Sequence, residues 1–187
     1  MGKKLSEKDF KRLIQLHIDK KNYVKIFLTE ESPEESASGF IVKYSDKYVM
    51  IQEIYDFMLV GFRILPYERI SSIRYNENEK IYKKIISEEG LLSFNHKVID
   101  STSLKSSEKL FKSLQEQNFH CIIESADKKH DFFTIGEITK VKNKSVMIHN
   151  YDSTGKLDNE PCKIPYKEIE FISFNDNYST VFRKYIK

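Results

Sequence analysis

Residues 64–73 read Ile-Leu-Pro-Tyr-Glu-Arg-Ile-Ser-Ser-Ile, and residues 163–172 read Lys-Ile-Pro-Tyr-Lys-Glu-Ile-Glu-Phe-Ile. Both stretches join two strand-like runs through a Pro-Tyr pair. Because proline has no backbone N–H to donate to a sheet, Pro66 and Pro165 are expected to end one strand and force a sharp corner into the next. The chain therefore contains the same strand, corner and strand unit twice.

The repetition extends over most of the chain. Residues 6–13 and 107–114 are identical at six of eight positions, Gly39 aligns with Gly136 at the start of a second strand, and residues 46–51 match residues 143–148. Apolar residues at the helical period follow Ser6 and again close each copy. Between these helices lie short β-branched and aromatic runs typical of strands. The predicted order is helix, five strands, helix, twice.

This order sets the expected domain organisation and fold class. We expect a first repeat over residues 1–90, a linker over 91–106 and a second repeat over 107–187. The fold class is α+β, mainly β. A sheet of five short strands avoids open edges by closing, which favours two tandem small barrels of Sm-like or SH3-like type, each flanked by an N-terminal and a C-terminal helix. The alternative is two tandem PH-like barrels, which also end in a helix but normally need seven strands.

Two stretches of each repeat resemble the Sm-like family, which includes bacterial Hfq. Residues 39–41, leading to Asp-Lys-Tyr-Val-Met-Ile at 46–51, resemble the first motif of that family. Residues 67–73 are similar to the Hfq stretch Tyr, Lys, His, Ala, Ile, Ser, Thr. The resemblance covers residues 22–75 and 118–174. It implies a bent five-stranded barrel and, by analogy, RNA binding.

The sequence departs from that family where its RNA contacts lie. Met50 and Met147 stand where eukaryotic Sm proteins have an asparagine that contacts RNA. The Lys-His pair of Hfq becomes Glu-Arg at 68–69 and Lys-Glu at 167–168. The resemblance therefore implies the fold more directly than the ligand.

The fourth strand differs most between the copies. Residues 57–65 are apolar on both faces, whereas residues 158–163 are polar and include Pro161. A strand that is apolar on both faces must be covered on both. Ring-forming Sm proteins pair strand four of one subunit with strand five of the next, so we expect copy one to supply an interface to copy two, to the linker or to another chain. Its candidate residues are Phe57, Leu59, Phe62 and Ile64.

Basic and aromatic residues recur at equivalent loop positions and form the candidate binding site. They are Lys47, Tyr48, Tyr67 and Arg69 in copy one, with Lys144, Tyr166 and Lys167 in copy two. Aromatic rings stack on bases and cations meet phosphates, which would suit an RNA or nucleotide ligand. Alternatively, Tyr67 and Tyr166 fill the barrel corners.

Two non-enzymatic functions are open. A net charge of +3 and an acidic stretch, with Glu30, Glu31, Glu34 and Glu35, favour a protein-interaction, adaptor or inhibitor protein that binds an unknown protein or forms a homo-oligomer. The alternative is an RNA- or nucleotide-binding Sm-like protein. The sequence supplies no argument for a membrane partner.

The remaining chemistry-bearing residues indicate no enzyme. The five histidines show no metal-ligand spacing with each other or with the cysteines, and no serine or cysteine lies in a nucleophile motif. We expect no cofactor and no metal. Cys121 and Cys162 need not form a disulfide, and no 18-residue apolar run occurs, so we expect a cytoplasmic protein.

Overall fold

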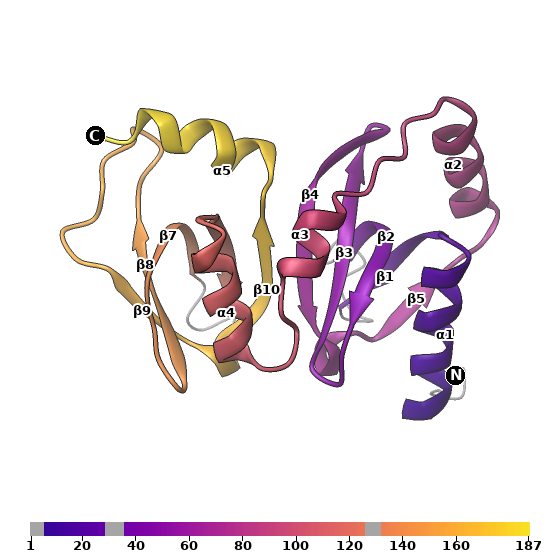
Figure 1. Cartoon of the computed structure of the whole chain (residues 1–187), viewed down its shortest axis with the longest axis horizontal. Coiled ribbons are helices and arrows are strands. Elements are labelled where there is room, and N and C mark those ends of the chain that lie inside the picture. The colour runs from indigo at the N-terminus through magenta and orange to yellow at the C-terminus, as the bar shows by residue number, and fades with distance from the viewer. Residues whose placement is uncertain (1–5, 29–35, 126–131) are drawn as a thin grey trace.

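The computed structural model describes residues 6–28, 36–125 and 132–187. Its fold is α+β and mostly β, with two halves side by side (Figure 1). The elements of the first half are α1 (Glu7–Asp19), β1 (Tyr23–Phe27), β2 (Ser36–Tyr44), β3 (Tyr48–Tyr55), β4 (Met58–Pro66), the short helix η1 (Tyr67–Arg69), β5 (Ser72–Arg74) and α2 (Glu77–Glu88). The acidic residues Glu30 to Glu35 lie outside the described residues.

A short helix, α3 (His96–Ser101), lies between the halves, and the second half repeats the order of the first. Its elements are α4 (Ser107–Glu116), β6 (His120–Ser125), β7 (Phe133–Val141), β8 (Ser145–Asn150), β9 (Cys162–Pro165), η2 (Tyr166–Glu168), β10 (Ile169–Phe174), α5 (Asn177–Phe182) and η3 (Arg183–Tyr185). None of the helices in the described residues combines the length and apolar character needed to span a bilayer.

All ten strands form one antiparallel sheet in the order β5-β1-β2-β3-β4-β10-β6-β7-β8-β9. Within each half the strand order is the same, with the fifth strand beside the first and the fourth at the far edge. The prediction of two closed barrels, Sm-like, SH3-like or PH-like, is therefore wrong in one respect: the sheet is not closed. The reason is that the outer edge of β4 pairs with β10 rather than with the fifth strand of its own half.

Both prolines end a strand at a sharp corner, as the sequence predicts. Pro66 ends β4, a single turn of 3-10 helix follows, and β5 then pairs with β1. Pro165 ends β9 in the same way before η2 and β10. The tyrosine after each proline donates its backbone N–H to a lysine carbonyl in a preceding turn, Tyr67 to Lys47 at 2.8 Å and Tyr166 to Lys144 at 3.1 Å. The corner is thus built identically in both halves.

Gly39 and Gly136 are required by close backbone approach. Each is the fourth residue of its strand, three residues later than the sequence pattern suggested. A Cβ on Gly39 would lie 2.1 Å from the carbonyl oxygen of Gln52, and one on Gly136 would lie 2.0 Å from that of His149. A side chain at either position would force neighbouring strands apart, so glycine fixes the same bend in both halves.

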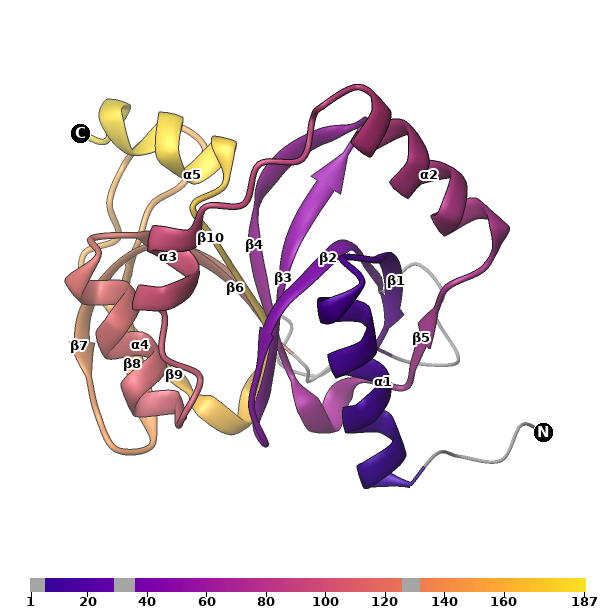
Figure 2. The ribbon, with the colours of Figure 1, turned by 45° about the vertical axis from the view of Figure 1, so that its right-hand side comes forward.

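The two halves are joined by the pairing of β4 with β10 (Figures 1 and 2). Ile64 lies opposite Ile172, and Phe62 lies opposite Phe174 with their rings stacked at 5.4 Å. All four side chains are at most 1% exposed. The Arg63 guanidinium lies 4.2 Å from the centre of the Phe171 ring and pairs with Glu53 at 3.1 Å. The apolar fourth strand of copy one is therefore covered within the chain.

The connection between the halves also belongs to the core. Val98, Ile99 and Leu104 are buried in the same cluster as Met50, Phe62 and the core of the second half. The Lys43 ammonium donates to the carbonyl oxygens of Ile99 at 2.9 Å and Thr102 at 2.6 Å, at the C-terminal end of α3. A cation there satisfies free carbonyls and opposes the negative end of the helix dipole. The predicted linker is therefore a packed element.

A buried histidine of α1 is connected to α2 through Asn22. His17 is 3% exposed, and the Lys83 ammonium donates to the amide oxygen of Asn22 at 2.9 Å. That contact turns the Asn22 amide nitrogen toward His17 Nδ1, 3.1 Å away, so Nδ1 must accept and the ring is neutral. Burial lowers the pKa of His17.

We expect replacement of the stacked phenylalanine to destabilise the whole molecule. Phe62→Ala should lower the free energy of unfolding by about 3–5 kcal/mol, because it opens a cavity in the core that both halves share. Met58→Ala, on the same strand but at a residue that is 61% exposed, should change it by less than about 0.5 kcal/mol. Urea denaturation measures both, and equal effects would contradict the shared core.

Stability should also fall in mild acid. The pKa values of His17 and His120 are lowered by burial, so the unfolded chain binds protons that the folded chain resists. Above pH 6.5 both histidines are neutral in the folded and in the unfolded chain, so the free energy of unfolding has its full value. Below it the free energy of unfolding should fall by up to about 1.4 kcal/mol per pH unit for each histidine, until the folded-state pKa is reached. His17→Gln should flatten urea midpoints measured from pH 7 to 5, whereas His96→Gln, at an exposed residue, should not.

Candidate functional site: a pocket at the junction of the halves

A pocket of about 290 Å³ lies where the corners of the two halves meet. The first half contributes the turn between β2 and β3 and the corner after β4. The second contributes the start of α4, η2 and the start of β10. Its lining residues are Asp46, Lys47, Tyr48, Pro66, Tyr67, Glu68, Ser107, Tyr166, Lys167 and Ile169. We call this the junction pocket.

Five of the seven candidate binding residues line this pocket: Lys47, Tyr48, Tyr67, Tyr166 and Lys167. Arg69 is near it but points its guanidinium at the carbonyl oxygen of Lys167, 3.4 Å away. Lys144 is not among the lining residues; its carbonyl oxygen instead accepts the backbone N–H of Tyr166. Lys47 and Lys144 occupy equivalent turns, but only Lys47 lines the pocket, because the two halves meet asymmetrically.

The candidate interface residues separate into two places. Phe62 and Ile64 lie in the pairing with β10. Phe57 and Leu59 instead pack against a cluster within the first half, which includes Tyr23 and Ile86. The apolar character of residues 57–65 thus serves two different contacts.

The tyrosines of the junction pocket are fixed by hydrogen bonds and ring contacts. Tyr48 donates to the Ser107 hydroxyl at 2.7 Å, and Tyr166 donates to the carbonyl oxygen of Lys142 at 2.7 Å while stacking on Phe111 at 5.5 Å. Burial raises the pKa of Tyr166 to about 12 and also raises that of Tyr48. All three phenols, with Tyr67 shifted in the same direction, are therefore neutral at pH 7.

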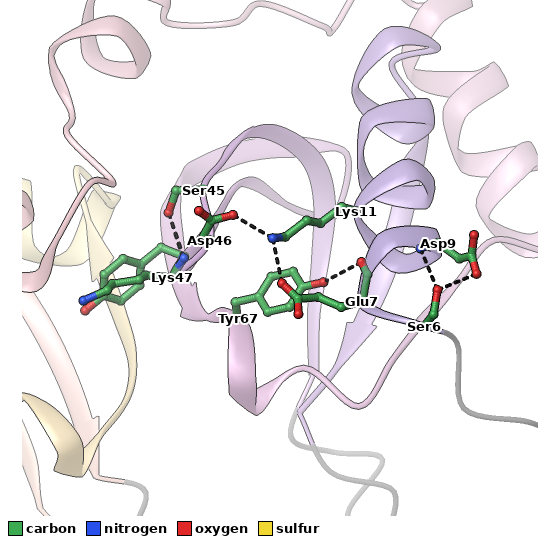
Figure 3. A network of polar contacts seen from close by, with 9 residues as sticks. Ser6, Glu7, Asp9, Lys11, Ser45, Asp46, Lys47 and Tyr67 are labelled. Atoms are coloured by element: carbon green, nitrogen blue, oxygen red, sulfur yellow. Dashed lines mark hydrogen bonds and ion pairs between the residues drawn. The ribbon is translucent and has the colours of Figure 1, made fainter.

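Tyr67 is held by α1, as Figure 3 shows. The Phe10 ring contacts it edge-on at 5.6 Å, and the Lys11 ammonium lies 5.8 Å from its centre. Lys11 bridges Asp46 at 2.6 Å and Glu7 at 2.7 Å. The hydrogen bond from Lys11 lowers the pKa of Asp46. This bridge fixes the turn between β2 and β3, and Lys47 points away from it (Figure 3).

The charge of the junction pocket is balanced. Its charged lining residues are two lysines, Lys47 and Lys167, and two acids, Asp46 and Glu68. Neither acid was among the candidates drawn from the sequence, although each is adjacent in sequence to a residue that was. Ser107 and Ile169 carried no local signal, because only the packing of the halves brings them there.

The lining of the junction pocket offers rigid tyrosine rings and charges of both signs, and it includes neither cysteine. Both cysteines are free, and burial raises the pKa of each thiol. Within residues 6–28, 36–125 and 132–187, no group of three His, Cys, Asp or Glu side chains is placed to hold a metal ion. The chain matches no family model, no curated protein and no solved structure.

Proposed function

We propose that this protein is a non-enzymatic protein-interaction module whose junction pocket receives a segment of a different protein. The observation that carries the proposal is the convergence of three tyrosines, two lysines and two acids from both halves on one pocket. Rigid tyrosines lose little entropy on binding and are enriched at protein interfaces. Charges of both signs suit a polypeptide, which carries both, better than a polyanion.

We further propose that each half is an Sm-like unit. The strand order of each half, with the fifth strand beside the first and the fourth at the far edge, supports this. The pairing of strand four of one half with strand five of the other supports it as well. In this proposal two Sm-like units form one sheet within a single chain.

The free edges of the sheet favour a different protein over further copies of this chain. Another copy could extend the sheet by pairing its β5 with β9, repeating the internal junction. At the positions of the buried Ile64 and Phe62, however, β9 and its approach carry Lys163 and Pro161. Lysine resists burial and proline lacks the N–H that pairing needs.

The edge of β5 is equally unsuited to repeating the junction. Arg74 stands at the position of the buried Ser173, and it is already paired with Glu79 at 2.7 Å. Bringing Lys163 and Arg74 into a paired edge would bury two cations without an additional acid. Both outer edges therefore disfavour a head-to-tail assembly.

The chain should consequently be monomeric. Light scattering after size exclusion at about 100 μM protein should give a mass of about 22.2 kDa. A mass of two or more chains would contradict the argument from the edges. Lys163→Ile removes the lysine from the β9 edge. If the wild type already forms a heavier species and Lys163→Ile does not enlarge it, the argument from the edges is contradicted most directly.

The protein-binding proposal is tested by reversing charge on both sides of the junction pocket. Lys47→Glu combined with Lys167→Glu should abolish capture of a partner from the source cells, because both cationic contacts become repulsive. Lys140→Glu, at an exposed residue of β7, is the matched control and should retain the partner. A protein that the wild type and both variants capture equally would contradict the proposal.

RNA or nucleotide binding is the alternative, favoured by the two lysines and three tyrosines of the same pocket. A mobility-shift titration of single-stranded RNA at 50 and 200 mM salt separates the two functions. Phosphate contacts would make affinity fall steeply with salt. A salt-sensitive shift that the double charge reversal removes would replace the protein-binding proposal, and no shift at micromolar protein would support it.

A further inference from the structure

A second pocket, of about 350 Å³, lies in the first half between α2 and the strands β1, β2 and β5. It shares no residue with the junction pocket, so a ligand bound there would be independent of the proposed function. Its lining residues are Tyr23, Lys25, Ser38, Arg74, Asn78, Glu79, Ile81 and Tyr82. We call it the helix pocket.

Two cations face each other in the helix pocket. Lys25 of β1 and Arg74 of β5 are directly opposite in the antiparallel register. Their charged groups lie on the same aromatic ring, with Lys25 Nζ 5.4 Å and the Arg74 guanidinium 5.6 Å from the centre of Phe27. Like charges placed directly opposite on neighbouring strands are destabilising. The contacts of both cations with the Phe27 ring offset part of this repulsion.

One acid compensates only one of these cations. Arg74 donates from Nε and Nη2 to the same oxygen of Glu79, at 3.0 and 2.7 Å. The other Glu79 oxygen accepts the backbone N–H of Asn76 at 2.9 Å, where α2 begins. Burial would raise the pKa of Glu79, but these hydrogen bonds outweigh it and lower the value, so the side chain is ionised.

The ammonium group of Lys25 differs from the Arg74 guanidinium in this respect. In the part of the chain that the structure describes, no acid lies within ion-pair distance of its ammonium group. The lining of the helix pocket therefore carries one positive charge in excess, from two cations and one acid. An excess of one charge matches a singly charged anion, such as a carboxylate, better than a doubly charged phosphate monoester.

The wall that faces this cation pair is aromatic and aliphatic. Tyr82 is held between the rings of Tyr23, at 5.2 Å, and Phe57, at 5.0 Å. Both faces of Tyr82 are thus covered, which leaves its edge and Ile81, 57% exposed, to meet a ligand. An alkyl or phenyl group could pack there. The Tyr23 hydroxyl is bonded to Ser38 at the same wall.

We propose that the helix pocket binds the carboxylate of an apolar organic acid, either a small free acid or the C-terminus of a chain that ends in an apolar residue. The carboxylate lies between Lys25 and Arg74 and relieves their repulsion. The apolar group packs on Ile81 and the edge of Tyr82. Lys25 is the binding residue whose charge no described acid pairs with.

The probe is N-acetyl-phenylalanine, with N-acetyl-phenylalanine amide as the matched neutral control. Amide ¹H–¹⁵N spectra of the full chain should show saturable shifts at Ser38 and Asn78 with the acid and none with the amide. Lys25→Gln should weaken binding by about tenfold or more, as expected for a lost charge-assisted hydrogen bond. Lys25→Arg should retain binding, and Lys140→Gln should not affect it.

Thermal unfolding provides the second measurement. Without probe, Lys25→Gln should melt close to the wild-type temperature, because it removes both the repulsion from Arg74 and the contact with the Phe27 ring. With probe, the wild type should gain more than the variant, since a ligand stabilises only the state that it binds. Equal binding of acid and amide, unchanged binding by Lys25→Gln, or shifts confined to the junction pocket would each overturn the proposal.

Phenylacetate distinguishes the two sources of the carboxylate. Binding as tight as that of N-acetyl-phenylalanine supports a small free acid, because the peptide group then contributes nothing. Binding of N-acetyl-phenylalanine alone supports a chain terminus, whose last amide group the pocket also recognises. Binding of neither probe overturns the proposal.

Discussion

The pairing of β4 with β10 is the interaction on which the rest of the structure depends. The strand order within each half leaves its fourth strand at an edge, and in the first half that edge is apolar. Stacking of Phe62 on Phe174 takes the edge out of water and merges it with the core of the second half. Because this pairing uses the edge, the sheet cannot close on itself. The result is one continuous sheet, and the connection through α3 becomes part of its core.

The same pairing creates the junction pocket and makes it asymmetric. Both corners are built alike, with a tyrosine N–H bonded to a turn lysine. At the junction, however, the turn of the first half meets the corner of the second, so Lys47 and Lys167 line the pocket and Lys144 does not. An internal duplication thus yields a single site of mixed composition. Neither copy contains that site by itself.

The features that the sequence predicts are those set by local chemistry. Proline ended both fourth strands because it lacks an N–H, and the apolar run over residues 57–65 indicated a strand covered on both faces. The prediction of closed barrels was wrong, because β4 could pair with the fifth strand of its own half or with that of the other half. These two strands offer edges of similar geometry, and the sequence does not distinguish them. The opposition of Lys25 and Arg74 was equally hidden, since it depends on the register of strands that are distant in sequence.

The facing cations of the helix pocket are replaced by uncharged residues at the corresponding positions of the second half, and the junction explains why. The positions of Lys25 and Arg74 correspond in the second half to Ile122 and Ser173, which are also directly opposite each other. Ser173 is 7% exposed because β10 is covered on its other side by β4, opposite Arg63. An arginine there would add a second cation beside Arg63, which is already paired with Glu53, whereas β5 lies at an open edge of the sheet and tolerates one. A pair of facing cations is thus tolerated at the end of the sheet that the junction leaves free.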